Sequence, residues 1–131
     1  MKKQLSILAL AAALTGCSTP GDLKRDYPPV TFKADAGYQL VLKRLVDRHQ
    51  ECAMAPLLPL GQVINDVQNY PDLRSATIIR GASGIGSQTN QVFEIRETGP
   101  NQTEVSFTQR FRVEHFAAYY ERVANGGAGC P

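Results

Sequence analysis

The segment Tyr38–Cys52 repeats apolar residues at helical spacing over about four turns, and this pattern constrains the fold more than any other in the chain. Its apolar stripe comprises Tyr38, Val41, Leu42, Leu45, Val46 and Cys52, whereas Lys43, Arg44, Asp47, Arg48 and Glu51 occupy the opposite face. We expect Asp35 to cap this helix, and Pro56 and Pro59 to end it. A single amphipathic helix cannot bury its own stripe, so the chain must supply a second layer.

The rest of the chain supplies one more amphipathic helix and several strands. Apolar spacing predicts a helix over Val113–Ala124, ended by Gly126 and Gly127. Alternating apolar and polar residues predict a hairpin of strands at 91–97 and 103–111, with one wet face. Further β-prone runs are 30–33, 75–80 and 60–68; the last also fits a short helix, but we favour a strand.

This order of elements predicts an α+β domain over residues 30–131. Both helices pack on one face of an antiparallel sheet of three to five strands, because a two-layer sandwich buries both stripes. No internal repeat or second linker interrupts this segment. The arrangement loosely resembles the helix-grip modules of some envelope lipoproteins, as a likeness of architecture without a shared residue motif.

The N-terminus has the features of an export signal. Lys2 and Lys3 precede an apolar run at 5–14, and small residues separate this run from Cys17. Such a run suits a secretory signal and is too short to span a bilayer permanently. The sequence Leu14-Thr15-Gly16-Cys17 resembles the lipobox of bacterial lipoproteins.

This resemblance implies a lipid on the Cys17 thiol and removal of the signal peptide, residues 1–16. Two or three acyl chains hold a protein firmly on a membrane, whereas one binds marginally. Because Ser18 follows, rather than the Asp associated with inner-membrane retention, the resemblance favours the outer membrane, with the domain facing the periplasm. The alternative is a soluble secreted protein with an incidental cysteine. Residues 18–29 contain three prolines and predict an extended tether of up to about 40 Å.

The three cysteines must be divided between lipidation and cross-linking. With Cys17 assigned to lipid, Cys52 ends the first helix and Cys130 follows the last one. An even remainder in an oxidising compartment predicts a Cys52–Cys130 disulfide. Closing a loop of about 79 residues stabilises the fold by roughly 4.5 kcal/mol, mainly by restricting the unfolded chain. A redox pair or a metal site is the alternative, but the chain has no C-x-x-C motif.

Charge and motifs argue against several function classes. The chain from Cys17 onward carries twelve basic and twelve acidic side chains, which is not the basic excess that nucleic-acid binding needs. His49 and His115 have no accompanying nucleophile motif and no paired-ligand spacing. We therefore predict no catalytic residue, no metal and no cofactor.

Two further groups of residues are weighed as binding elements. Gly81, Gly84 and Gly86 lack the order of a dinucleotide-binding fingerprint, and we interpret 81–90 as a flexible loop that becomes the candidate binding loop if the protein has a ligand. Arginines on the predicted strands are interleaved with Glu94, Glu97 and Glu104, which favours a mixed solvated face over a basic binding surface. These arginines are Arg74, Arg80, Arg96, Arg110 and Arg112.

Together these features favour a non-catalytic envelope lipoprotein. It serves as a structural or docking module for a periplasmic or outer-membrane protein, through the open sheet edge or the wet sheet face. The alternative is a module that binds a lipid or a small apolar ligand, which requires a mostly apolar concavity of several hundred Å³. An enzyme is least favoured, because the sequence shows no paired carboxylates, nucleophile motif or metal cluster.

Replacing the thiol tests the anchor directly. Cys17→Ser leaves an uncleaved, unlipidated precursor, because no other group in the motif accepts the diacylglyceryl chain. Metabolic labelling with a palmitate analogue and the size of the product measure both effects. Cys130→Ser is the matched control and retains the label; label that persists in Cys17→Ser contradicts the anchor.

Overall fold

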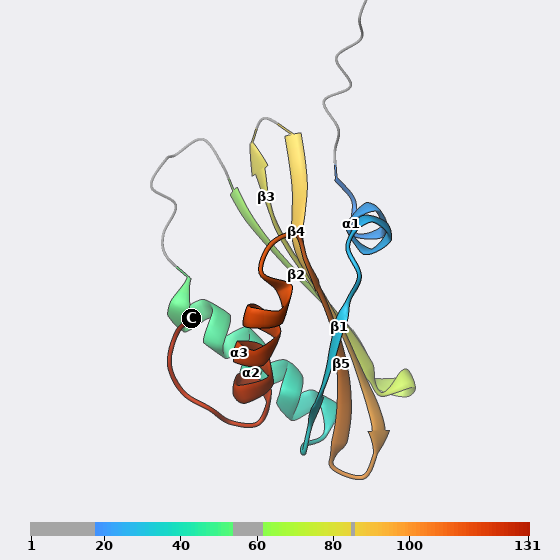
Figure 1. Cartoon of the computed structure of the whole chain (residues 1–131). Helices are drawn as coiled ribbons and strands as arrows, with labels where there is room; N and C mark the ends of the chain where they lie inside the picture. Colours follow the sequence, from blue (N-terminus) through green and yellow to red (C-terminus); the bar gives the residue numbers. More distant parts are fainter. Residues whose placement is uncertain (1–17, 54–61, 85) are drawn as a thin grey trace, which may run out of the picture.

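The protein, described here from a computed structural model over residues 18–53, 62–84 and 86–131, is built on one antiparallel sheet with strand order β1-β5-β4-β3-β2 (Figure 1). The predicted α+β class is confirmed. The strands are β1 (Val30–Ala34), β2 (Gln62–Tyr70), β3 (Ser75–Gly84), β4 (Gly86–Gly99) and β5 (Gln102–Gln109). The helices are α1 (Pro20–Asp26), α2 (Tyr38–Cys52) and α3 (Val113–Ala124), with a short 3-10 turn, η1 (Pro71–Leu73).

One face of the sheet is buried beneath α2 and α3. Phe93 of β4 and Phe107 of β5 are fully buried, and their ring centroids lie 4.8 and 5.1 Å from that of Tyr120 in α3. Val41 and Leu45 of α2 are also fully buried in this cluster. The two apolar stripes therefore pack against a single sheet face, as the sequence predicts.

The N-terminus of α2 is capped differently from the prediction. Asp35 is not the N-cap; Gly37 holds that position and makes no side-chain bond. The Glu97 carboxylate of β4 accepts a hydrogen bond from the Tyr38 backbone N–H at 3.4 Å, and a negative charge there suits the helix dipole. The Asp35 N–H instead donates to Asn125 Oδ1 at 2.9 Å, which holds Asp35 in the β1–α2 connection.

The predicted disulfide is confirmed. Cys52 and Cys130 are bonded, with their Cα atoms 5.5 Å apart, so the end of α2 is joined to the tail that follows α3. The Tyr119 hydroxyl donates to the Gly129 carbonyl at 3.1 Å and holds the same tail. The predicted helix stops Pro56 and Pro59, the lipobox with Cys17, and residues 60 and 61 lie outside the described residues.

The sheet is longer than the sequence predicts. The strand favoured at 60–68 is confirmed from Gln62 onward, but the flexible loop expected at 81–90 is wrong. There β3 and β4 continue as a hairpin in which Gly84 pairs with Gly86, because ladder pairing outweighs the weak strand preference of glycine and serine. At the bulge after Arg80, a Cβ on Gly81 would lie 2.2 Å from the Gln88 carbonyl oxygen, so this position requires glycine.

The tether expected at 18–29 is wrong where helix α1 forms, although Tyr27 is extended as predicted. Thr19 and Asp22 form a capping box, Pro20 takes the first turn, and the resulting helix α1 buries Leu23 completely. Lys24 pairs with Glu94 at 2.7 Å, and Glu94 lies on the sheet face opposite to that of Phe93. Helix α1 thus covers part of the face that α2 and α3 leave open (Figure 1), and the folded domain includes residues N-terminal to Val30.

Truncating the buried leucine of α1 tests this correction. Leu23→Ala is expected to lower the free energy of unfolding by about 2–5 kcal/mol, because it leaves a cavity between α1 and the sheet. Urea denaturation of the chain 18–131 measures the loss. Lys24→Ala is the matched control and costs less than about 1 kcal/mol, since it removes only an exposed ion pair. An unchanged midpoint in Leu23→Ala is the result expected of a solvated tether and contradicts the docked helix.

Candidate functional site

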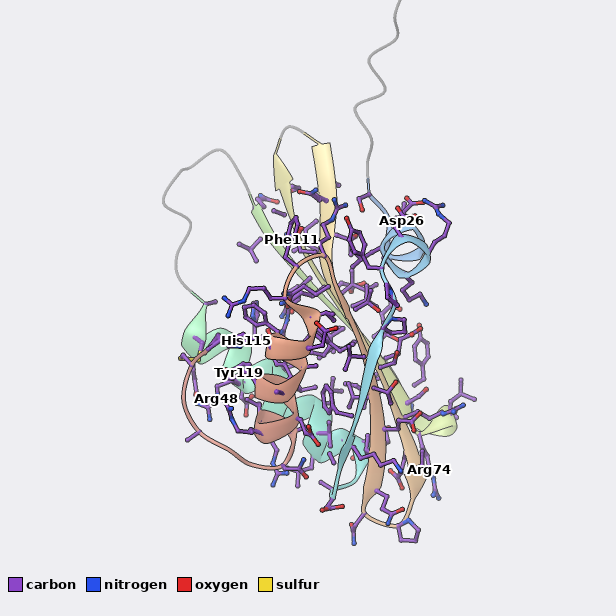
Figure 2. All side chains as sticks on the ribbon, viewed as in Figure 1. Asp26, Arg48, Arg74, Phe111, His115 and Tyr119 are labelled. Atoms are coloured by element: carbon purple, nitrogen blue, oxygen red, sulfur yellow. A yellow bond between two sulfur atoms is a disulfide. The ribbon has the colours of Figure 1, made fainter. Side chains whose placement is uncertain are left out.

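A groove of about 690 Å³ opens on the side of the sheet that α2 and α3 cover. Its lining includes Gly81 and Ala82 of β3 and Gln88 of β4. Figure 1 shows that the ends of β3 and β4 at this hairpin extend beyond the two helices. Figure 2 shows Phe111 beyond the start of α3, beside this part of the hairpin. No helix among the described residues is long and apolar enough to cross a bilayer.

Large apolar side chains form part of the wall. Val63 of β2 is 56% exposed and Phe111, after β5, is 75% exposed, although both belong to a concave surface. Phe116 of α3 is partly buried, packs against the core and also lines the groove. Exposed apolar residues that gather in a concavity, rather than singly, are typical of ligand sites.

A buried arginine also lines the groove. Arg80 of β3 is only 3% exposed, and its guanidinium carbon lies 4.9 Å from the centre of the Phe93 ring. Nη2 donates to the Leu45 carbonyl at 3.0 Å and Nε to Asn65 Oδ1 at 3.3 Å, whereas Nη1 is buried and has no hydrogen-bond partner among the described residues. Burial lowers the pKa of Arg80, but an arginine keeps its charge in proteins.

A second arginine, Arg110, contacts Ser18, the first residue that the structure describes. Nη2 of Arg110 donates to Ser18 Oγ at 2.8 Å, and its guanidinium lies 5.8 Å from the Tyr27 ring centre. Its Nε is buried and finds no hydrogen-bond partner within the part of the chain that the structure describes. Ser18 itself is tied to β4 beyond the end of β5, because its N–H donates to Ser87 O and its carbonyl accepts from Thr89 N–H, both at 3.2 Å. Ser18 therefore lies against a residue that lines the groove.

The charged side chains among the described lining of the groove are all positive. Arg80 and Arg110 form no ion pair with any described carboxylate, and the described residues that line the groove include no Asp or Glu. His49 of α2 joins them in the lining; burial foremost, and then the charge of Arg80, lower the pKa of His49 below its usual value, so it is neutral at pH 7. The described lining thus carries two arginines and no acidic side chain, beside apolar walls, and the Arg110 guanidinium is held against Ser18 and Tyr27 at its border.

The predicted mixed solvated face is wrong for Arg80. Arg96 does lie on the open face, opposite Glu104 in the ladder, and Arg74 lies 3.7 Å from Glu97. Arg112 immediately precedes α3, with its guanidinium 6.0 Å from the Phe116 ring centre. The signal for Arg80 was present in the sequence, because alternation along β3 places it on the same face as Ala76 and Ile78.

The other candidate residues from the sequence, namely the three glycines and His115, do not come together in the groove. Of the three glycines, Gly81 lines the groove, whereas Gly84 and Gly86 pair at the far end of the hairpin. His115 is exposed on α3 and does not line the groove (Figure 2). In the described ranges, no group of three His, Cys, Asp or Glu residues is placed to hold a metal ion.

The outer edge of β2 is a second candidate surface. Among the described strands, β2 pairs only with β3, so the backbone of its other side has no strand partner. It is nine residues long, carries a single charge at Asp66 and exposes Val63 and Val67. Edge strands are usually protected by lysine, proline or bulges, and within these nine residues such protection is slight.

No protein-family model, curated protein or solved structure matches this chain. The function is therefore argued from the groove and the sheet edge.

Proposed function

We propose that the chain is a lipid-anchored envelope protein whose folded domain binds a small amphipathic ligand in the groove. The observation that carries this proposal is a concavity of about 690 Å³ in which exposed Val63 and Phe111 lie beside the buried cation of Arg80. Ligand sites typically enclose about 300–1,000 Å³ and combine apolar walls with a few fixed polar groups. These dimensions favour the ligand-binding alternative over a purely structural role.

The lining supports binding without catalysis. The described residues around the groove offer guanidinium, imidazole and carboxamide groups, and no carboxylate, thiol or hydroxyl that could act as a nucleophile or its orienting partner. Gln91 is already held in place, since its Nε2 donates to Gln109 Oε1 at 2.6 Å and to the Tyr120 hydroxyl at 3.3 Å. Fixed amides of this kind orient a ligand rather than transform it.

The lipid on Cys17 and the outer-membrane location belong to this proposal and depend on the lipobox and on Ser18. Cys17 is joined to Ser18, whose hydroxyl is bound by the groove residue Arg110. Because α1 is folded onto the sheet, little free chain separates the anchored residue from the domain. The groove would therefore lie close to the membrane surface, where amphipathic molecules are concentrated.

Removing one apolar wall tests the proposed function. The chain 18–131 contains every helix, strand and disulfide described above, and it is free of lipid. Titration with decanoate or decanol is expected to shift backbone amide NMR signals at 80–82 and 88–91. Phe111→Ser weakens binding about tenfold, because a bound ligand would cover the Phe111 ring. Full burial of a Phe side chain contributes about 1.5–3 kcal/mol, and tenfold corresponds to about 1.4 kcal/mol.

Leu73→Ser is the matched control for this titration. Leu73 is 71% exposed in η1 and is not part of the groove, so its removal leaves binding unchanged. Absence of any saturable shift, or equal losses in the two variants, contradicts a ligand site in the groove.

The edge of β2 supports docking of a partner protein as a second candidate function. An extended segment of another envelope protein adding to β2 would pair the free backbone groups of Gln62–Tyr70 and cover Val67. Strand addition needs no chemistry from side chains, which agrees with the non-catalytic module that the sequence favours.

In-cell photo-crosslinking distinguishes this candidate. A photoreactive residue at Asn69 of β2 is expected to capture a discrete protein neighbour, whereas the same residue at Glu121, exposed on α3, captures none above background. Mass spectrometry of the crosslinked bands gives the comparison. Equal background capture at the two positions contradicts docking at the edge.

A further inference from the structure

We propose that the groove selects amphiphiles with an anionic head, and that Arg80 and Arg110 attract a terminal carboxylate or phosphate while the apolar chain lies along Val63 and Phe111. The inference depends on the proposed function, because it specifies the ligand of the same groove. It starts from Arg80 and Arg110, each of which has one buried N–H group without a hydrogen-bond partner among the described residues.

Arg80 is the stronger of the two observations. Its guanidinium is buried against the rings of Phe93 and Tyr120, a backbone carbonyl and Asn65, none of which is a carboxylate. A buried cation without a counter-ion is costly, and a donor without a partner adds to that cost. An anion in the adjoining groove would reduce this cost. The burial of Arg80 therefore favours the binding of a negatively charged ligand over a neutral one.

This attraction does not require a direct bond to Nη1. Coulomb interactions across a protein wall of low effective dielectric are several times stronger than in water. Arg110 adds a second positive charge, and its Nε is another buried donor that has no partner in the described ranges. Since no acidic residue is among the described lining, the field in the groove is not cancelled locally.

The rest of the lining suits an amphiphile with a small head. Gln88, Asn90 and Gln91 of β4 line the groove with carboxamide groups that can donate to head-group oxygens. Val63 and Phe111 offer apolar area away from the core, where a single acyl chain would lie. A neutral or cationic head would leave both arginines unpaired and would gain only the contact with the apolar wall.

The experiment compares heads on a common ten-carbon chain. The chain 18–131 is titrated by NMR with decanoate, decyl phosphate, decanol and decyltrimethylammonium, all below their micellar concentrations. We expect the two anions to bind about tenfold to a hundredfold more tightly than decanol, the range for hydrogen bonds to charged groups. The better of the two anions distinguishes a fatty-acid carboxylate from a phospholipid-derived phosphate, and added salt reduces the preference.

Two variants and one control assign the preference to the arginines. Arg80→Met and Arg110→Met are each expected to lose most of the preference for decanoate over decanol while decanol binding is retained. Arg96→Met removes an arginine from the opposite face of the same sheet and keeps the wild-type ratio. Should Arg80→Met fail to fold, the Arg110→Met ratio decides alone, because Arg110 is only half-buried at the groove.

The outcomes separate the two proposals. If decanol binds as tightly as decanoate, or if both arginine variants keep the anion preference, the anionic head is refuted while the ligand-binding groove stands. If none of the four amphiphiles binds saturably in the groove, the proposed function fails as well.

Discussion

The burial of one sheet face beneath α2 and α3 is the constraint from which the other features of this domain follow. Two amphipathic helices each carry a stripe that must leave water, and the aromatic face around Phe93 and Phe107 is the surface that receives both. The Cys52–Cys130 disulfide holds the end of α2 to the tail after α3 and so keeps the two helices side by side on that face. Removing either helix would expose the same aromatic rings.

The lengths of the elements explain why a groove exists at all. At 1.5 Å per residue, the 15 residues of α2 span about 22 Å, whereas the 14 residues of β4 extend about 46 Å at 3.3 Å per residue. Helices of this length cannot cover the whole face of such strands. The uncovered length is the hairpin beyond Arg80, and the groove lies where the helical layer ends.

Arg80 lies at this boundary. Alternation along β3 directs it to the helix-covered face, and the bulge that follows changes the register at Gly81. Its guanidinium thus packs against Phe93 of the core, and the residue also lines the groove. Ser18 and Arg110 meet at the same end of the sheet, which places the proposed membrane attachment and the proposed ligand site next to each other.

Much of the fold was accessible from the sequence because its signals are local. The stripes of α2 and α3 and the alternation around Phe93 and Phe107 are periodic patterns, and the disulfide followed from the parity of the cysteines. Of the candidate site, the sequence singled out Gly81, but it assigned Arg80 to a solvated face. The groove itself was foreseen only as a requirement of the ligand-binding alternative.

The sequence by itself determined the α+β class, the two long helices, the core-facing side of the central hairpin and the cysteine pair, since each depends on residue spacing along one segment. Only the tertiary structure decided that α1 forms, because a seven-residue helix is marginal until Leu23 is buried against the sheet. It also decided that 81–84 pairs with 86–89 and that Glu97 caps α2, because neither the ladder nor this cap is encoded by residue spacing within one segment. The burial of Arg80 without a counter-ion among the described residues belongs with them, since it depends on where two helices stop above a longer sheet.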